Sequence, residues 1–512
     1  MKLQTMMNWF GNTQHSDESS SIKHRGPDLT SKLEHGPNTF VFHRLSINDL
    51  SDAGNQPIVK GDTIVVCNGE IYNHEVLRST LAHGSYAGGS DCEVIAQMLH
   101  NGTNVHDICN SLDGVFAFIA ARGDVVYAAR DPIGVRPLFY GHSTVDNSMA
   151  FASEIKALQS FCTDVFEFPN GHYYDSTDDS FHMYHNVGLQ PSQNIPYHPQ
   201  TLRNILESSV SKRLMSDRPV AFFLSGGLDS SLIAAIGAKL LGKIHTFSIG
   251  IGESPDLKAA RKVAKHIGSS HTEVMFTAEE GISAMKDVVY ALESYDCTTI
   301  RASIPMFLLS RYVSKNTDFR VILSGEGADE LFGGYLYFHN APSACEFQKE
   351  TLRLLNNVKS HDVLRADRCT AHHGLELRVP FFDREMLHYV TSIAGSSKTP
   401  VEGVEKYILR KAFDDDNLLP KEILWRQKNG MSDAVGYSWV DHVRQHADRH
   451  VNDDTSNEVF SKNLPLSKEE LMYRRLYTSM YPLADVLPHV WRPKWTTETD
   501  PSAKLLSVFE TN

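Results

Sequence analysis

A short apolar run at residues 220–224 passes directly into the sequence SGGLDS at residues 225–230. This order predicts a buried strand, a tight turn and a helix that begins near Asp229. The glycines let successive N–H groups point into one concavity, and the helix N-terminus adds partial positive charge on the same side. Pyrophosphate is the ligand that this arrangement favours, with Asp229 placed to hold its magnesium ion. The alternative is an ordinary strand–helix turn capped by Asp229 or by a serine.

The chain after residue 200 alternates helical patterns with short apolar runs. Helical periodicity covers 202–214, 230–241, 256–267 and 282–292, and the apolar runs are 220–224, 244–249 and 321–323. Such alternation is typical of a parallel sheet with crossover helices. From about residue 340 the pattern is mostly helical. We therefore expect an α/β unit with a helical C-terminal part.

The first 185 residues have a different pattern, with short β-type runs separated by turn signals. Strands are predicted at 39–42, 63–66, 114–119 and 125–128, and helices mainly at 73–81 and 91–100. Strands with few helices between them favour an antiparallel α+β sandwich. Three prolines fall within residues 186–200, a polar segment that reads as a linker.

Composition excludes several classes of partner. A net charge of −13 argues against nucleic-acid binding, which requires a basic face. No window of about eighteen apolar residues occurs, so no membrane span is expected, and the first residues do not resemble a secretory signal. The seven cysteines are scattered without a CxxC pair, which favours reduced thiols. The expected location is the cytoplasm.

Several segments resemble known enzymes. SGGLDSS at 225–231 resembles the pyrophosphate loop of the ATP-pyrophosphatase superfamily. Resemblance to asparagine synthetases in particular lies in FSIG at 247–250, SPDL at 254–257, YD at 295–296, TTIRAS at 298–303, SGEGADE at 324–330 and LRVPF at 377–381. It extends from about His24 to Ala503, and the segments 425–428 and 493–503 are similar to the animal-type enzyme. The resemblance implies an α/β parallel-sheet ATP-pyrophosphatase domain with a helical C-terminal part.

The resemblance also implies an ordered chemistry with ATP and Mg²⁺. Aspartate attacks the α-phosphorus of ATP to give pyrophosphate and β-aspartyl-AMP, and ammonia then displaces AMP to give asparagine. The resemblance implies that ATP is bound by a pyrophosphate cradle of Ser225, Gly226, Gly227 and Ser230, by an adenine site of Phe223 and Ile249, and by nucleotide contacts at Ser324, Gly325 and Lys428. Asp229 and Asp329 would ligate the magnesium ion. Glu326 would support the intermediate, and Arg378 would clamp the α-carboxylate of aspartate. Asn429 stands where the family usually has an acidic residue after the lysine.

The N-terminal half resembles the class II glutamine amidotransferase domain, an N-terminal-nucleophile hydrolase with an α/β/β/α sandwich. The matching segments are HRGPD at 24–28, RLSI at 44–47, NGEIYN at 68–73, GSD at 89–91, RDPIGVRPL at 130–138 and ASEIKAL at 152–158. The glutamine-binding residues implied are Arg44, Leu45, Ser46, Ile47, Asn48, Asn68, Gly69, Glu70 and Asp91. Arg44 would pair with the α-carboxylate, and Glu70 and Asp91 with the ammonium. Asn68 and Gly69 would form the oxyanion hole, although Asn-Gly read alone predicts a hairpin turn.

The catalytic nucleophile of that family is an N-terminal cysteine, whose own α-amine acts as general base. Here Met1 is followed by Lys2, and the first cysteine is Cys67, which reads as a small buried hydrophobe. Two explanations remain open. Either the chain uses only ammonia, or the given start is not the natural one, an explanation that the sequence NWFG at 8–11 favours.

The sequence therefore predicts an asparagine synthetase that takes nitrogen from glutamine or ammonia. The expected division is a glutaminase domain at 1–185, a linker at 186–200, a synthetase domain at 201–505 and a tail at 506–512. Small-molecule substrates are the expected partners, and a homodimer is among the expected arrangements. The alternatives are another ATP-pyrophosphatase, such as a β-lactam-forming synthetase, and a non-catalytic paralogue.

Overall fold

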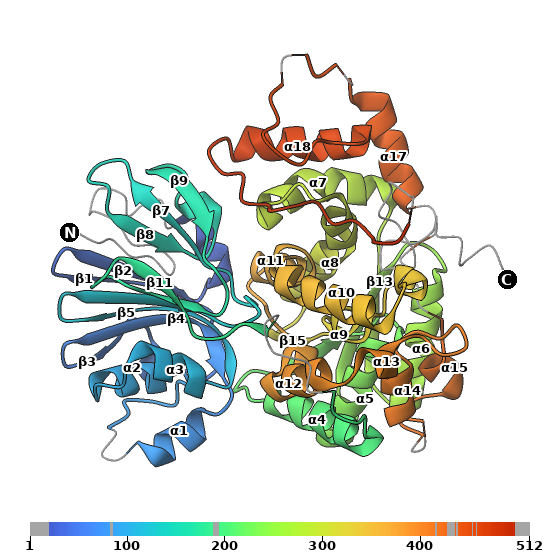
Figure 1. Ribbon diagram of the computed structural model, residues 1–512, viewed down its shortest axis with the longest axis horizontal. Coiled ribbons are helices and arrows are strands. Elements are labelled where there is room, and N and C mark those ends of the chain that lie inside the picture. Colours follow the sequence, from blue (N-terminus) through green and yellow to red (C-terminus); the bar gives the residue numbers. More distant parts are fainter. Residues whose placement is uncertain are drawn as a thin grey trace.

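The structure, a computed structural model, describes residues 20–81, 85–187, 194–414, 417–427, 436, 439–452, 454–456 and 458–496. Two halves of different architecture lie side by side (Figure 1). No helix in these ranges is both long and apolar enough to cross a membrane.

Among its described residues, the N-terminal half contains antiparallel sheets and three α-helices. Its elements are β1 (Leu29–His35), β2 (Asn38–Arg44), β3 (Ile58–Lys60), β4 (Thr63–Ile71), α1 (His74–Thr80), α2 (Glu93–His100), α3 (Val105–Ser111), β5 (Gly114–Arg122), β6 (Val125–Arg130), β7 (Phe139–Ser143), β8 (Met149–Ala152), β9 (Cys162–Glu167), β10 (His172–Asp175) and β11 (Ser180–Met183). Six strands form one sheet in the order β11-β10-β6-β5-β4-β3, and smaller sheets pair β1 with β2 and β8 with β7 and β9. The predicted α+β sandwich is confirmed, and α3 was not predicted.

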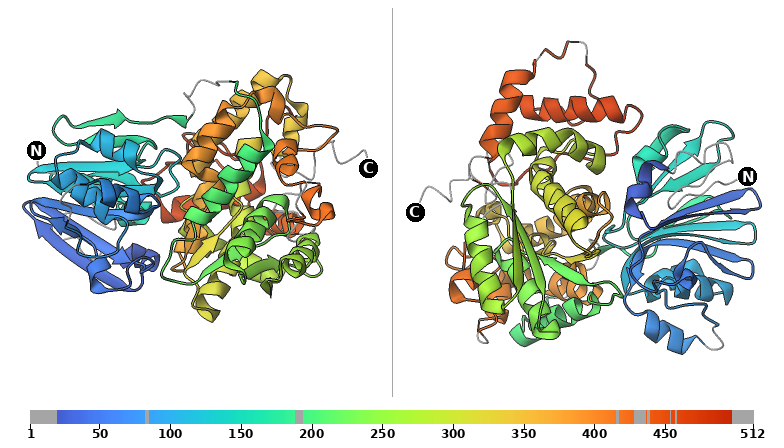
Figure 2. Two further views of the ribbon diagram at one scale, coloured as in Figure 1. Left: turned by 90° about the horizontal axis from the view of Figure 1, so that it is seen from below. Right: turned by 180° about the vertical axis from the view of Figure 1, so that it is seen from behind.

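The second half is built on a five-stranded parallel sheet in the order β14-β13-β12-β15-β16. Its elements are α4 (Pro199–Lys212), β12 (Val220–Phe223), α5 (Leu228–Leu241), β13 (His245–Gly250), α6 (Pro255–Ile267), β14 (Ser270–Met275), α7 (Ala278–Leu292), α8 (Cys297–Asn316), β15 (Val321–Leu323), α9 (Ala328–Phe332), α10 (Ala344–Asn357), α11 (Asp362–Ala371), β16 (Glu376–Arg378), α12 (Arg384–Ser392), α13 (Gly395–Lys398), α14 (Tyr407–Ala412), α15 (Lys421–Leu424), α17 (Trp439–His450) and α18 (Lys468–Met480). The predicted parallel sheet is confirmed, and Figure 2 shows its strands from behind. Helices α17 and α18 pack on α7.

Local sequence signals explain where the helices of this sheet begin and end. Ser254 caps α6 through a hydrogen bond from the Leu257 N–H, and Gly268 ends it in a left-handed conformation with φ 65°. Thr277 and Glu280 form a reciprocal capping box at the start of α7. These caps fix the connections that carry the chain from one parallel strand to the next.

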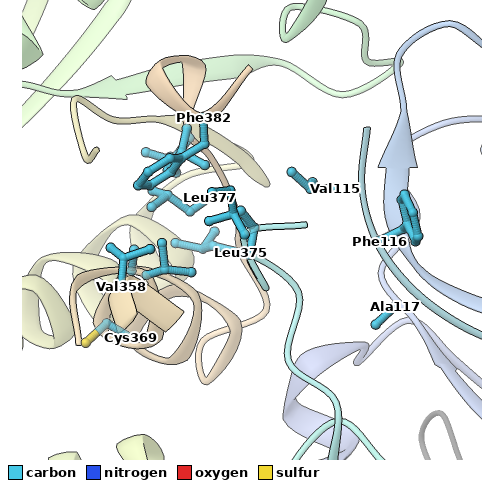
Figure 3. Packing of buried hydrophobic residues seen from close by; sticks show 14 of the residues in the cluster. Val115, Phe116, Ala117, Val358, Cys369, Leu375, Leu377 and Phe382 are labelled. Carbon is cyan, nitrogen blue, oxygen red and sulfur yellow. The ribbon is translucent and has the colours of Figure 1, made fainter. Parts of the chain in front are cut away.

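The two halves share one hydrophobic core. A single cluster of buried residues runs from β5 through α11 and β16, and it includes Phe116, Leu375 and Leu377 (Figure 3). Removing apolar side chains from water is the dominant stabilising term in folding. The halves are therefore held together by continuous packing.

Buried ion pairs cross the same boundary. Arg25 lies 2.8 Å from both Glu154 and Asp367, and Arg368 lies 2.8 Å from Glu154. Glu293 accepts hydrogen bonds from two backbone N–H groups of the N-terminal half, at residues 155 and 156. Burial alone would raise the pKa of the Glu154 carboxyl, but the neighbouring cations Lys156, Arg368 and His24 hold it well below its ordinary value.

Candidate functional sites

The larger cavity, about 230 Å³, lies at the carboxyl ends of β12, β13 and β15. This edge of an open parallel sheet is where ligands bind in such folds. Of the residues predicted for ATP, its lining includes Phe223, Ser225, Gly227, Asp229, Ser230, Ile249, Ser324 and Gly325. Asp329 and Glu326 line it too. We call it the nucleotide cavity.

The predicted turn between β12 and α5 is present. Gly226 has φ +76°, and a Cβ there would lie 2.4 Å from the Ala260 N atom, so glycine is required. Ser225 Oγ lies 3.0 Å from Ser230 Oγ and accepts a hydrogen bond from the Gly227 N–H at 3.3 Å. The loop is thus a compact, self-bonded turn at the start of α5. Ser225, Gly227 and Ser230 line the cavity, whereas Gly226 does not.

A second loop closes against the first one. Gly325 packs so tightly that a Cβ would lie 2.5 Å from the Ser230 N atom. Arg426 Nη1 donates a hydrogen bond to the Gly226 carbonyl at 3.1 Å, and its Nη2 pairs with Asp256 at 2.9 Å. Arg426 lines the cavity as well. Its guanidinium adds a positive charge to the wall of the cavity, and the sequence did not predict this role for Arg426.

The two predicted magnesium ligands converge on a lysine. Lys406 Nζ lies 2.5 Å from Asp229 Oδ2 and 2.6 Å from Asp329 Oδ1, and the lysine side chain is 1% exposed. Asp229 Oδ1 is buried and has no hydrogen-bond partner among the described residues. Sequence reading missed Lys406, because a single lysine in a polar segment carries no motif.

Apolar side chains form another wall of the cavity. Phe223 and Ile249, the residues predicted to contact adenine, line it together with Phe247, Met306 and Leu309. Flat aromatic and aliphatic surfaces suit the face of a purine ring. The structure thus brings the predicted adenine residues to the same cavity as the loop at 225–230.

Glu326 belongs to a group of charges that the sequence reading did not foresee. Arg365 donates to both of its carboxylate oxygens, at 3.1 and 2.7 Å, and also donates to Asp362 at 2.7 Å. The Tyr335 hydroxyl donates to Glu330 at 2.6 Å and to Asp362 at 3.0 Å. All five residues line the nucleotide cavity.

Electrostatics in this group favour a cationic ligand. Burial raises the pKa of Glu326, and Arg365 opposes that rise. Burial also raises the pKa of Glu330 well above its ordinary value, and the nearby charges of Asp362 and Asp329 add to it. An ammonium group between these carboxylates would relieve their repulsion.

Arg378 lies elsewhere. Its side chain is fully buried, it does not line the nucleotide cavity, and it points toward the N-terminal half from the edge strand β16. Its Nε donates to Glu376 at 2.7 Å, and its Nη1 donates to the carbonyls of Arg213, at 2.9 Å, and Met215. This placement corrects the prediction that Arg378 binds the aspartate α-carboxylate, because its side chain does not reach the nucleotide cavity.

The smaller cavity lies in the N-terminal half. Eight of the nine residues predicted for glutamine line it: Arg44, Leu45, Ile47, Asn48, Asn68, Gly69, Glu70 and Asp91. Ser46 does not line it, and its N–H donates to Asp28 at 2.9 Å. Residues 371, 375 and 376 of the second half also contribute to the wall. We call this site the glutamine pocket, after the ligand that the sequence predicts for it.

The polar groups of the pocket are arranged around two carboxylates. Asn48 Nδ2 donates to Glu70 at 2.6 Å and to Asp91 at 3.3 Å. Burial raises the pKa of both carboxyls. Arg44 donates to the carbonyls of Ser51, at 2.9 Å, and Asp49, so it also holds the adjoining loop.

The Asn68-Gly69 pair is in a strand, not in a turn. Both residues lie in β4 opposite β5, and a Cβ on Gly69 would lie 2.4 Å from the Val115 carbonyl oxygen. The Asn68 Nδ2 is buried without a hydrogen-bond partner among the described residues. A buried amide of this kind is available to an oxyanion.

Some predictions lie outside the described residues. They concern Lys428, Asn429, residues 1–11 with the expected nucleophile position, and the tail at 506–512. Cys67 is described, buried and free.

Comparisons with known proteins identify the family of each half of the chain. The asparagine synthase family model matches residues 201–347 and 341–506, and the glutamine amidotransferase domain model matches residues 6–192. Asparagine synthetase [glutamine-hydrolyzing] 2 from Arabidopsis thaliana is 42% identical over 526 residues, covering 95% of this chain and 90% of the relative. Asparagine synthetase [glutamine-hydrolyzing] from Asparagus officinalis is 41% identical over 525 residues, covering 95% and 88%. The chain belongs to the family of glutamine-hydrolysing asparagine synthetases.

Proposed function

We propose that the nucleotide cavity joins aspartate to AMP and that the glutamine pocket serves the supply of nitrogen. A β-carboxylate oxygen of aspartate bonds to the α-phosphorus of ATP, and the bond to the bridging oxygen breaks, which releases pyrophosphate. Ammonia then attacks the β-carbonyl carbon of β-aspartyl-AMP, AMP leaves, and a proton passes to a base. The observation that carries this proposal is the convergence of Asp229, Asp329 and Lys406 beside the loop at 225–230.

Magnesium is part of the proposal. The Asp229 Oδ1, which has no hydrogen-bond partner in the described part of the chain, and the nearby Asp329 carboxylate are hard oxygen ligands of the type that Mg²⁺ prefers. When bound, the ion neutralises negative charge on the leaving pyrophosphate. Lys406 holds the two carboxylates together and presents a cation to the phosphates.

The remaining nucleotide contacts follow from the lining of the cavity. Phe223 and Ile249 would contact the adenine, and the N–H groups at the start of α5 would face the pyrophosphate beside the Ser225 and Ser230 side chains. Ser324 and Gly325 would hold the nucleotide from the second loop. Lys428 remains a proposed phosphate contact from its sequence position alone.

Aspartate is proposed to lie against the charged wall formed by Glu326, Glu330, Tyr335, Asp362 and Arg365. Its α-ammonium would lie between Glu330 and Asp362, whose negative charges crowd a buried site. Glu326, held by both guanidinium nitrogens of Arg365, would accept the proton from the attacking ammonia. This arrangement replaces the clamp expected at Arg378.

In the glutamine pocket, Glu70 and Asp91 would take the α-ammonium of glutamine, and Arg44 its α-carboxylate. The free Asn68 amide and the Gly69 N–H would stabilise an oxyanion. The Leu45, Ile47 and Asn48 side chains complete the wall.

We also propose the limits of the domains and the type of enzyme. The domain limits are 1–185, 186–200, 201–505 and 506–512, and the enzyme is of the animal type, as the segments at 425–428 and 493–503 suggest. Its seven cysteines are all free, which supports a reducing cytoplasmic location.

A homodimer is the proposed assembly, and analytical ultracentrifugation of the full chain would test it.

Product analysis tests the reaction. The full chain, supplied with Mg-ATP, aspartate and ammonium chloride, should form AMP, pyrophosphate and asparagine in equal amounts. Asp229→Asn should lower this turnover by about 100-fold or more, because a charged metal ligand is lost. The matched control is Asp448→Asn at an exposed carboxylate on α17. Formation of ADP and phosphate, or an unaffected Asp229→Asn variant, would show that the site is assigned wrongly.

A further inference from the structure

Glu70 is a buried carboxylate whose counter-charge comes from the other half of the molecule. It lies in β4, is 4% exposed and lines the glutamine pocket. Arg378 Nη2 lies 3.1 Å from its Oε2, the oxygen that also accepts the hydrogen bond from Asn48. Arg378 belongs to β16 of the parallel sheet. The contact therefore crosses the boundary between the two halves.

Arg378 is held in place on every side. Besides Glu70 it contacts Glu376 and the carbonyls of Arg213 and Met215. Its own carbonyl accepts the N–H of Ser324, and its register partner in β15 is Leu323. A guanidinium with this many fixed acceptors has little freedom to turn away, so it presents a fixed charge to Glu70.

The charge on Glu70 depends on this arginine. Burial raises the pKa of Glu70 well above its ordinary value, and Glu376 and Asp91 push in the same direction. Arg378 is the strongest influence that lowers it, and Arg136 is a weaker one. Without Arg378 the carboxyl would be held neutral by its surroundings up to a higher pH.

We infer that Arg378 is a positioning residue of the glutamine pocket, supplied by the synthetase half to keep Glu70 oriented and ionised for the α-ammonium of glutamine. The inference rests on the proposed function of this pocket. It assigns to Arg378 a role in nitrogen supply in place of the aspartate clamp. It also makes the pocket incomplete without the second half of the chain.

Direct binding separates this role from general stability. The probe is 2-amino-5-oxohexanoate, the methyl ketone isostere of glutamine, titrated calorimetrically into the full chain between pH 6 and 8.5. Arg378→Met should weaken binding about 10-fold or more at pH 7, since the cation that keeps Glu70 charged is lost. The defect should shrink as the pH rises and Glu70 ionises again. The wild type should show the same dependence displaced to lower pH, because Arg378 lowers the pKa of Glu70.

Charge and coupling are tested by further variants. Arg378→Lys retains the positive charge but loses the fixed guanidinium contacts, so it should bind the probe less tightly than the wild type and more tightly than Arg378→Met. Glu70→Gln should bind weakly at every pH, and adding Arg378→Met to it should change little, because the partner is already gone. The matched control is Arg368→Met, which removes another fully buried arginine at the boundary that lines neither cavity. It should leave probe binding intact.

The outcomes distinguish the role inferred for Arg378 from the proposed function of the glutamine pocket. If Glu70→Gln binds as the wild type does, the glutamine pocket is assigned wrongly and both fall. If Glu70→Gln is weak but Arg378→Met binds normally, only the role of Arg378 is overturned. If circular dichroism shows that Arg378→Met does not fold, the Arg378→Lys variant is used instead. A loss of probe affinity in that variant that is independent of pH and as large as the loss in Glu70→Gln would overturn the inference.

Discussion

Lys406 Nζ lies 2.5 Å from Asp229 Oδ2, although the two residues are 177 positions apart in the chain. The same ammonium also contacts Asp329. The lysine precedes α14, and the aspartates stand at the starts of α5 and α9. One buried cation thus fixes the spacing of two carboxylates that are proposed to hold a metal.

Replacing that lysine should expose the repulsion between the carboxylates. We expect Lys406→Met to lower the melting temperature in the absence of Mg²⁺. Adding MgCl₂ at about 10 mM should restore much of this loss, because an ion that binds only the folded state stabilises it by mass action. Pyrophosphate release should fall about 100-fold, since a cation facing the phosphates is gone. Differential scanning fluorimetry and a pyrophosphate assay measure the two effects. Lys411→Met, on the exposed face of α14, is the control. Equal melting temperatures without Mg²⁺ would contradict the prediction.

Arg365→Lys should shift the pH dependence of ammonia-dependent synthesis. Burial already raises the pKa of Glu326, and the paired guanidinium limits the rise. A lysine cannot contact both carboxylate oxygens in the same way, so the pKa should rise further. If ionised Glu326 accepts the proton, the acid limb of the rate profile must move to higher pH. The exposed Arg261→Lys variant, whose ion pairs lie on the surface, should keep the wild-type profile. A shift toward lower pH would refute the proposed base.

Glu154→Gln should destabilise the boundary between the halves. The carboxylate contacts Arg25, Lys156 and Arg368, and its loss leaves buried positive charges without their partner. The expected loss is about 3–5 kcal/mol in the free energy of unfolding, from urea denaturation. The exposed pair of Lys262 and Glu422 provides the control, and Lys262→Gln should change stability by less than about 1 kcal/mol. Similar small losses in both variants would show that the buried pairs do not hold the halves together.

His372 and His373 should make the fold sensitive to mild acid. Burial is the main cause that lowers the pKa of His372 to about 4 and that of His373 to about 3, from 6.5. Below pH 6.5 the unfolded chain takes up protons that the folded one does not, so the free energy of unfolding falls as the pH falls. Between pH 6.5 and 5 the loss should be about 1.5 kcal/mol for each histidine.

The His372→Gln and His373→Gln variants should each flatten this dependence. Urea denaturation at several pH values measures it, and only the difference from the wild type is used because carboxylates also titrate in acid. His266→Gln, at an exposed position on α6, should retain the wild-type slope. A slope that stays unchanged in both buried variants would contradict the prediction.

Much of the fold could be predicted because its signals are local. The strand at 220–224 and the helix at 230–241 correspond to β12 and α5 within two residues, since alternation, glycines and caps depend on near neighbours. The three-residue strand β16 was not predicted, because so short a run has no periodicity of its own. It forms through its pairing with β15.

The sequence by itself predicted the turn at 225–230, the nearby carboxylates of Asp229 and Asp329, and most residues that line the glutamine pocket, because these residues lie in compact motifs. Only the tertiary structure decided that Lys406 stands between Asp229 and Asp329 and that Arg378 faces Glu70. A lone lysine or arginine reads as a surface charge until the fold removes water from it. Burial then requires an opposite charge within a few ångströms, and which residue supplies it depends on how distant segments pack.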